Sequence, residues 1–439
     1  MEARAATLTL ALLALAAAVA AGPADFPWLF PDSNKGLKPT RLVTFGSTHY
    51  YQMAENPIGT VAFFHGCARS ARNFFPYDPL NCPECLGFPE HLSHTKQALA
   101  RGYNVLALEP HDSKGLCWSS SDKGIYINDQ PQAISTLRYF IVSNNLTNLP
   151  IYLWGASSGG TLALKMMGQL YRFDQQTQED AAKNGTRPPY TLWGSVRGVI
   201  AEAATPTDFD ASDADGNLLW PGFPPVIFVR MERDGADADV AQNLAFFARN
   251  GVPSDVIVSP VRRIGPTYFS DRSPTITQEQ SQRIVEGLKQ IGLLGEEGWL
   301  LANPKEDNDP KTPAYKWTVK LQTLLPWLTP MSKSVSLVLK FSPIQQSMLV
   351  AYAMHDAVSD YFTACLAWLE AGGKVDAQPL AHQLVVPGFN LSALTPDRRY
   401  PPPPPLPAAE DQDSQPKAHA QQLEAPSSDA KPRRRSQDL

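Results

Sequence analysis

The sequence predicts an α/β protein built on a doubly wound, mostly parallel β-sheet. Short runs rich in β-branched and aromatic residues alternate with longer segments of helical periodicity, and each short run is apolar enough to be buried on both faces. The 439-residue chain is 43% hydrophobic and 18% charged, which supports a large core and excludes a disordered chain, a heptad-rich fibre and a collagen-like rod.

Five strands are predicted, with a sixth candidate after them. They are Thr60 to Phe64, Asn104 to Leu108, Ile151 to Trp154, Val196 to Ala201 and Pro225 to Val229, and the candidate is Asp255 to Ser259. Helical patterns lie between them at His91 to Ala100, Pro131 to Ser143, Gly160 to Tyr171 and Val240 to Arg249, each followed closely by a Gly, Asn or Pro stop signal. In such sheets the chemistry lies at the carboxyl ends of the strands, so the loops after the strands are where a site is expected.

The two ends of the chain differ from this body. Residues 5–22 carry no charge and include the Ala- and Leu-rich segment Leu8 to Val19, which predicts a secretory signal peptide over residues 1–22 and a secreted or endomembrane-lumenal protein. An organelle transit peptide or a retained N-terminal anchor is the alternative, and no later segment is long and apolar enough to span a membrane. Residues 396–439 lose nearly all large apolar residues and hold the run Pro401 to Pro405, which predicts a disordered, Pro-rich tail.

A G-x-S-x-G motif directly follows the predicted strand Ile151 to Trp154 and leads into a helix. Ser157 is its central residue, with Gly155 and Gly159 two positions on either side. In strand-turn-helix context this motif forms a nucleophile elbow, whose sharp turn needs glycines where strand and helix approach. A Gly/Ser-rich loop without chemistry is the alternative. We therefore predict that Ser157 is a nucleophile.

An acyl-transfer serine also needs N–H donors for the oxyanion, and one of them comes from the loop after an earlier strand. Here that loop begins His65-Gly66-Cys67-Ala68. The backbone N–H groups of Cys67 and Ser158 are the predicted donors. His65 precedes the serine in the chain, whereas the base of such a site follows it, so we interpret His65 as a structural histidine.

The acid is expected after the next-to-last strand. Asp234 follows Pro225 to Val229 in a turn that would present its carboxylate. Asp237 and Asp239 are close alternatives, although an aspartate there more commonly caps the helix that follows. Glu232 is a less favoured alternative.

The chain order Ser, Asp, His leaves three histidines as candidates for the base. His355 follows the apolar run Met348 to Met354 and precedes the helical pattern Tyr361 to Leu369, which predicts a strand-loop-helix placement for its imidazole. His382 lacks a following helix, and His419 lies in the predicted tail. We predict that His355 is the base.

With these residues the chain resembles the α/β-hydrolase superfamily and, within it, a largely uncharacterised plant and green-algal group. The resemblance covers about Thr60 to Glu370, and the C-P-E-C block and the His segment are more specific to this group than the elbow. Besides the elbow it rests on His65-Gly66-Cys67, Cys82-Pro83-Glu84-Cys85-Leu86-Gly87 with Pro89-Glu90, Pro266-Thr267-Tyr268-Phe269 with Asp271-Arg272, and Ala353-Met354-His355-Asp356.

The interval from Asp234 to His355 is far longer than in a minimal α/β hydrolase. We therefore expect one domain over residues 23–395 with a helical cap or lid inserted at about residues 262–345. Gln278 to Leu294 has helical periodicity. The insertion also contains tryptophans that are more often plain core than the roof of an apolar pocket, namely Trp299, Trp317 and Trp327.

Cys82 and Cys85 form a C-x-x-C that could be a redox pair, half of a zinc site or a disulfide. Its Pro/Gly-rich loop is unlike a redox motif, and the spacing to nearby histidines is too tight for a zinc finger. In an oxidising lumen we expect disulfides, with the pairing left open, while Cys365 is expected to be buried and unpaired. The candidate disulfide cysteines are Cys67, Cys82, Cys85 and Cys117.

The sequence thus predicts a serine hydrolase that acts on a small-molecule ester, or on a thioester or amide. In this interpretation Ser157 attacks the acyl carbon, His355 is base and then acid, and Asp234 orients the imidazole. No metal or cofactor is implied, and a pI near 5.9 excludes the basic surface that nucleic-acid binding needs. The alternative is a non-catalytic relative with a binding or structural role.

Overall fold

The computed structural model describes residues 36–121, 127–187, 190–206, 218, 220, 222–308, 316–328, 337 and 342–385 of the chain. All of these residues belong to one compact unit. The predicted signal peptide, the predicted tail with His419, and part of the predicted insertion lie outside the described residues. Within the described part, no helix has the length and hydropathy needed to cross a bilayer.

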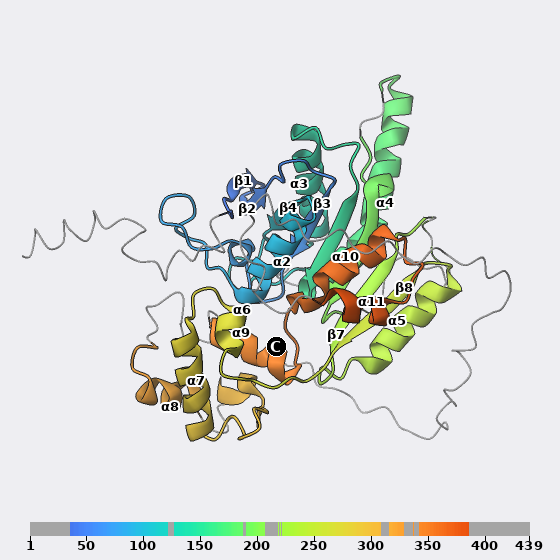
Figure 1. Ribbon diagram of the computed structural model, residues 1–439. Coiled ribbons are helices and arrows are strands. Elements are labelled where there is room, and N and C mark those ends of the chain that lie inside the picture. Colours follow the sequence, from blue (N-terminus) through green and yellow to red (C-terminus); the bar gives the residue numbers. More distant parts are fainter. Residues whose placement is uncertain are drawn as a thin grey trace, which may run out of the picture. The chain divides into compact units, whose positions relative to one another are not determined.

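Eight strands form one sheet within the described residues (Figure 1). They are β1 (Thr40–Thr44), β2 (Ser47–Gln52), β3 (Gly59–Phe64), β4 (Tyr103–Leu108), β5 (Ile151–Ala156), β6 (Val196–Glu202), β7 (Val226–Met231) and β8 (Ser254–Ser259). The sheet order is β1-β2-β4-β3-β5-β6-β7-β8; β2 is antiparallel to both of its neighbours and every other pairing is parallel. This is the α/β-hydrolase fold. All five predicted strands and the sixth candidate are present, so the predicted fold class is confirmed.

Strands β1 and β2 were not among the predicted strands. They form a hairpin whose tight turn holds Phe45 at φ 50° and Gly46 at φ 81°. Strand β1 lies at the edge of the sheet and none of its side chains is buried. It therefore lacks the apolar run that identifies the buried strands.

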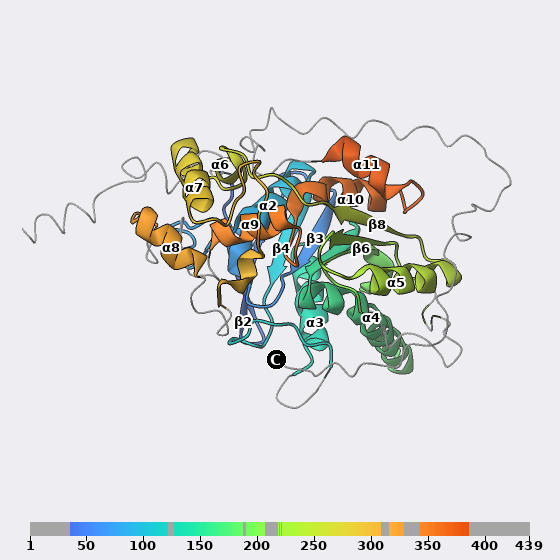
Figure 2. The same cartoon turned by 90° about the horizontal axis from the view of Figure 1, so that it is seen from below.

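Helices cover both faces of the sheet (Figure 2). The side chains of Val61 and Phe63 pack toward one face with α2, α10 and α11, and those of Ala62 and Phe64 pack toward the other with α3, α4 and α5. This alternation is the two-residue period of a strand buried on both faces. The helices are α2 (Pro89–Ala100), α3 (Gln130–Ser143), α4 (Ser158–Lys183), α5 (Asp237–Arg249), α10 (Phe362–Glu370) and α11 (Ala377–Leu384).

The prediction of a strand in the apolar run Met348 to Met354 is wrong. Most of the run lies in helix α9 (Pro343–Tyr352), which begins with a proline in its first turn and with Ser342 Oγ accepting a hydrogen bond from Gln345 N–H at 3.0 Å. Nine of the ten residues of α9 are buried, so the helix is enclosed by other residues on nearly every side. Periodicity alone cannot distinguish a short buried helix from a buried strand.

The segment between β8 and His355 has an apolar cluster of its own. Trp317 is fully buried in this cluster and donates its indole N–H to Pro304 O at 2.9 Å, whereas Trp299 is 37% exposed. Trp317 is therefore a core residue. The helices of this insertion are α6 (Tyr268–Arg272), α7 (Gln278–Gln290), η5 (Pro304–Asn308), α8 (Trp317–Leu324) and α9, and Figure 1 shows them in yellow and orange below the sheet.

Three buried charged residues join α2, the insertion and the segment after His355. Arg272 of α6 donates to Glu90 Oε1 at 2.8 Å and to Asp360 Oδ1 at 2.7 Å. Glu90 Oε2 also accepts from the backbone N–H and the hydroxyl of Ser359, at 2.9 and 2.8 Å. The side chains of Glu90, Arg272 and Asp360 are at most 6% exposed. Buried charges are tolerated only when they are paired, so these contacts must form together.

We expect Arg272→Met to lower the free energy of unfolding by about 3 kcal/mol or more, because the Glu90 carboxylate would stay buried without its cation. Urea denaturation followed by circular dichroism measures this loss. The control is Arg263→Met, since Arg263 is an exposed arginine of the same insertion that pairs loosely with Glu297 at 3.8 Å. A loss no larger than that of the control would show that the buried network does not stabilise the fold.

Candidate active site

Ser157 lies in the turn between β5 and α4, with φ 52° and ψ −119°. A positive φ is unfavourable for a residue with a Cβ and persists only where the surroundings impose it. Here the backbone N–H of Ser157 donates to Glu202 O at 2.8 Å, and its carbonyl accepts from Thr161 N–H at 3.0 Å. The turn therefore holds the Ser157 side chain at the carboxyl end of the sheet, as a nucleophile elbow requires.

The two elbow glycines are required by the close approach of strand and helix. A Cβ on Gly155 would lie 2.3 Å from Gly159 O, and a Cβ on Gly159 would lie 2.0 Å from Phe64 O. Both distances are far below van der Waals contact, so no larger residue fits without moving the backbone. Gly159 thus lets α4 start directly against the end of β3.

The structure brings Ser157, His355 and Asp234 into one hydrogen-bonded chain. Ser157 Oγ lies 2.9 Å from His355 Nε2, and His355 Nδ1 lies 3.0 and 3.2 Å from the two carboxylate oxygens of Asp234. A carboxylate only accepts hydrogen bonds, so Nδ1 carries the proton and Nε2 is free to accept from the serine hydroxyl. The Asp234 side chain is 8% exposed and that of His355 is 40% exposed.

Two loops place Asp234 and His355 beside each other. Asp234 follows β7, and the neighbouring Arg233 N–H donates to Ala353 O at 2.9 Å, two residues before His355. The hydrogen bond that His355 Nδ1–H donates to Asp234, opposed by burial and by the charge of Lys305, raises the pKa of His355. His355 is thus a stronger base than a free imidazole.

The alternative acids and bases lie elsewhere. Asp237 starts α5 and pairs with Arg230, and Asp239 is exposed in the first turn of that helix. Glu232 Oε2 accepts from Val261 N–H at 2.9 Å. His382 is exposed on α11.

The loop after β3 lies against the elbow. A Cβ on Gly66 would be 3.4 Å from Ser157 Cβ, and the next residue, Cys67, lines the same cavity as Ser157. Within the described residues, neither the Cys67 N–H nor the Ser158 N–H has a hydrogen-bond acceptor. His65 Nδ1 lies 2.9 Å from Gly66 O and Nε2 lies 3.5 Å from Glu109 Oε2, so His65 is not part of the hydrogen-bonded chain of Ser157.

The four cysteines predicted to form disulfides do so in two pairs, Cys67 with Cys117 and Cys82 with Cys85. The first pair ties the loop after β3 to the loop after β4, and Ala68 N–H donates to Gly115 O at 3.0 Å across the same junction. Cys365 is buried and free, as predicted.

A cavity of about 420 Å³ opens above Ser157 and His355. One side is formed by the ends of the strands and the loop after β3, and the other by residues of the insertion. A cavity of this volume accommodates a small molecule. The insertion contributes Lys305, Gln345 and Leu349 to its wall.

Sequence reasoning missed two buried residues beneath this site, Glu202 and His94. The Glu202 carboxylate accepts from Val358 N–H at 3.0 Å and lies 3.1 Å from His94 Nε2, while its backbone oxygen accepts from Ser157 N–H. Glu202 therefore links the elbow to the segment that follows His355. The available signal for Glu202 was an ionisable residue that directly follows the apolar run Val199 to Ala201.

No family model matches the chain, and no curated protein matches it. Among solved structures it is similar to a dienelactone hydrolase from Anabaena variabilis, with 16% identity, 51% of this chain and 88% of that chain covered, and a TM-score of 0.32. It is also similar to esterase B from Lactobacillus rhamnosis, with 13% identity, 59% of this chain and 84% of that chain covered, and a TM-score of 0.34. A third similar structure is an esterase/lipase from an uncultured bacterium, with 12% identity, 57% of this chain and 82% of that chain covered, and a TM-score of 0.31. Likeness at this level says nothing about the activity of this chain.

Proposed function

We propose that the protein is a serine hydrolase of small-molecule esters, with activity on thioesters or amides as a related capacity. The supporting observation is a pair of hydrogen bonds: one joins Ser157 Oγ to His355 Nε2, and the other joins His355 Nδ1 to the Asp234 carboxylate. Ser157 and His355 line a cavity large enough for a substrate. Fold alone would not support it, because α/β folds also serve proteins without this chemistry.

In the proposed reaction Ser157 Oγ attacks the carbonyl carbon while its proton passes to His355 Nε2. The backbone N–H groups of Cys67 and Ser158 stabilise the resulting oxyanion. His355 then returns the proton to the departing alcohol, and the acyl group stays on Ser157. A water molecule, deprotonated by His355, attacks the acyl-enzyme, and the proton goes back to Ser157 Oγ as the carboxylic acid leaves. Asp234 stabilises the imidazolium in both halves.

The proposed location is outside the cytosol, in a secreted form or in an endomembrane lumen. The two disulfides support it, because disulfides persist in oxidising compartments and are rare in the cytosol. The Cys67–Cys117 bond lies directly beside the proposed oxyanion donor, so an oxidising compartment would also preserve the geometry of the site.

A fluorophosphonate probe tests the proposal. We expect the full-length protein to be labelled once, at Ser157 by peptide mass spectrometry, and Ser157→Ala to remain unlabelled. Ser143→Ala is the matched control, since Ser143 is an exposed serine at the end of α3 and should not affect labelling. Equal labelling of wild type and Ser157→Ala would refute the assignment of the nucleophile. A folded wild type that neither reacts nor hydrolyses esters would favour the non-catalytic alternative.

A further inference from the structure

The charges of the side chains that line the cavity do not sum to zero. Arg69, Lys305 and Asp356 are the charged residues in its wall besides the histidines, and Asp234 lies behind His355 outside the lining. Arg69 Nη2 donates to Asp356 Oδ2 at 2.9 Å, and both side chains are at most 13% exposed. The two charges of this pair compensate each other, which leaves the ammonium group of Lys305.

Arg69 is held in this pairing by a second contact. Its guanidinium carbon lies 4.8 Å above the centre of the Phe88 ring, and Asp356 Oδ1 accepts from Gln346 Nε2 at 3.3 Å. The pair is thus a fixed part of the cavity wall rather than a group that is free to meet a ligand.

Lys305 belongs to the insertion and its backbone is firmly positioned. The carbonyl of the preceding residue, Pro304, accepts from the buried indole of Trp317 at 2.9 Å and from Gln345 Nε2 at 3.3 Å. Within the described residues, no acidic side chain pairs with the Lys305 ammonium group, and Lys305 is an exposed residue that lines the cavity. Its charge lowers the pKa of His355, which agrees with a position near the imidazole.

A buried donor also lines this cavity. His91 of α2 is 1% exposed, and its Nδ1 accepts from Gln346 Nε2 at 3.4 Å, so its proton is on Nε2. Within the described residues that Nε2 atom has no acceptor. Burial and the charge of Arg69 lower the pKa of His91, so the ring is a neutral donor at neutral pH. A buried donor without a partner is costly unless a ligand supplies the acceptor.

We propose that the cavity selects esters that carry a carboxylate, with Lys305 as the residue that binds it. The inference rests on the proposed hydrolase function and adds a substrate class to it. One uncompensated positive charge matches one negative charge, which favours a monoanionic carboxylate over a more highly charged group. The His91 ring is neutral, so it adds no charge, and its Nε2–H offers a hydrogen bond to an oxygen of the same substrate.

Two esters test the proposal: mono-4-nitrophenyl glutarate, which carries the carboxylate, and its methyl ester, in which a methyl group replaces that charge. Release of 4-nitrophenol measures cleavage of the same aryl ester bond in both. We expect wild type to favour the anionic ester by about tenfold in kcat/KM, equivalent to about 1.4 kcal/mol. Lys305→Gln should remove the preference by raising KM for the anionic ester, and Lys305→Glu should reverse it. Rising ionic strength should weaken the preference of wild type, because it screens exposed charges.

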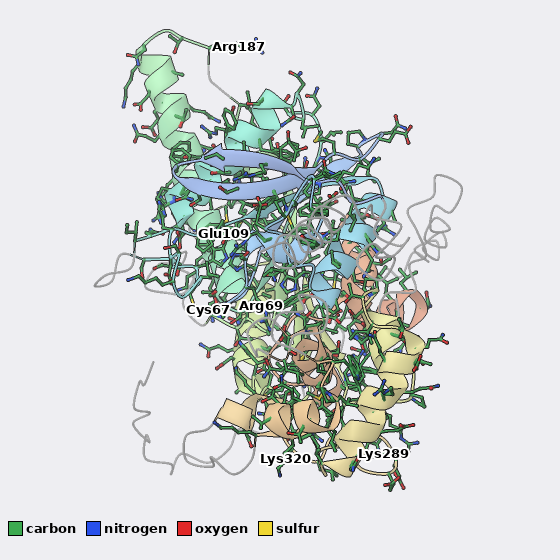
Figure 3. All side chains as sticks on the ribbon, turned by 90° about the vertical axis from the view of Figure 1, so that its left-hand side faces the viewer. Cys67, Arg69, Glu109, Arg187, Lys289 and Lys320 are labelled. Carbon is green, nitrogen blue, oxygen red and sulfur yellow. A yellow bond between two sulfur atoms is a disulfide. The ribbon has the colours of Figure 1, made fainter. Side chains whose placement is uncertain are left out.

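Lys320→Glu is the matched control. Lys320 is an exposed lysine of the same insertion, in α8, and Figure 3 shows it at the far end of the insertion from Arg69. Lys320→Glu changes the net charge of the protein by the same amount as Lys305→Glu. A preference that is reversed in Lys305→Glu and kept in Lys320→Glu therefore reflects the position of Lys305 in the cavity wall. Both esters react at the same His355, so a change in the pKa of His355 affects both equally and cancels in the ratio of their kcat/KM values.

The outcomes separate the two proposals. A wild type that reacts with the fluorophosphonate probe but does not favour the anionic ester, or a Lys305→Gln variant that keeps the preference, overturns the carboxylate site and leaves the hydrolase intact. Absence of both labelling and turnover in folded protein overturns the hydrolase and the carboxylate site with it.

Discussion

Replacing His355 with alanine is expected to lower kcat/KM for ester hydrolysis by roughly 10⁵-fold or more, the scale found when the base of a serine hydrolase is removed. Without the imidazole, Ser157 Oγ must attack with its proton still bound, and the leaving alcohol receives no proton. Steady-state hydrolysis of a neutral 4-nitrophenyl ester measures the loss. The circular dichroism spectrum should not change, because the His355 side chain is 40% exposed and contributes little to the core.

Two comparisons make this prediction specific. His382→Ala should retain activity within about twofold, since that histidine is exposed on α11. The double variant Ser157→Ala/His355→Ala should be no slower than either single variant, because residues that act as a unit are not additive. Loss of activity in His382→Ala with retention in His355→Ala would move the base to the other histidine.

Asp234→Asn is expected to lower kcat by roughly 10⁴-fold. The asparagine side chain can keep the distance to His355 Nδ1, but its amide group can donate as well as accept. It therefore no longer holds the proton on Nδ1 and no longer stabilises the imidazolium. The matched control is Asp237→Asn, which removes an exposed carboxylate three residues along the chain that pairs with Arg230 instead.

The same variant should change the pH dependence of kcat/KM. His355 acts as a base only when neutral, so activity rises with pH through its pKa. The hydrogen bond and charge of Asp234 raise that pKa, and burial and Lys305 lower it. Asp234→Asn removes the hydrogen bond to the carboxylate and its charge, which are the larger raising causes, and leaves the smaller effect of Asp356. The rise of kcat/KM on the acid side of the pH profile should therefore move to lower pH. A rise that stays in place or moves to higher pH would mean that Asp234 does not set the pKa of His355.

Much of the fold and of the candidate site could be predicted because the signals are local. The buried strands are uninterrupted apolar runs, and the tight packing at Gly155 and Gly159 requires glycine at fixed positions within six residues. Chain order then reduced the candidates for acid and base to a few residues. The prediction of His355 rests on chain order and on a strand in Met348 to Met354. That segment is mostly helix α9, so the chain order supports the prediction and the strand does not.

The sequence by itself determined strands β3 to β8 and the glycines at the turn that holds Ser157, since each depends on residues that are neighbours along the chain. Only the tertiary structure decided which cysteines pair, that Arg272 meets Glu90 and Asp360, and that Lys305 and Ser157 line the same cavity. Arg272 and Glu90 are 182 residues apart, and no local pattern records which distant charge a buried side chain will meet. Such partners are selected by desolvation, because a charge leaves water only where the whole fold supplies its counter-charge.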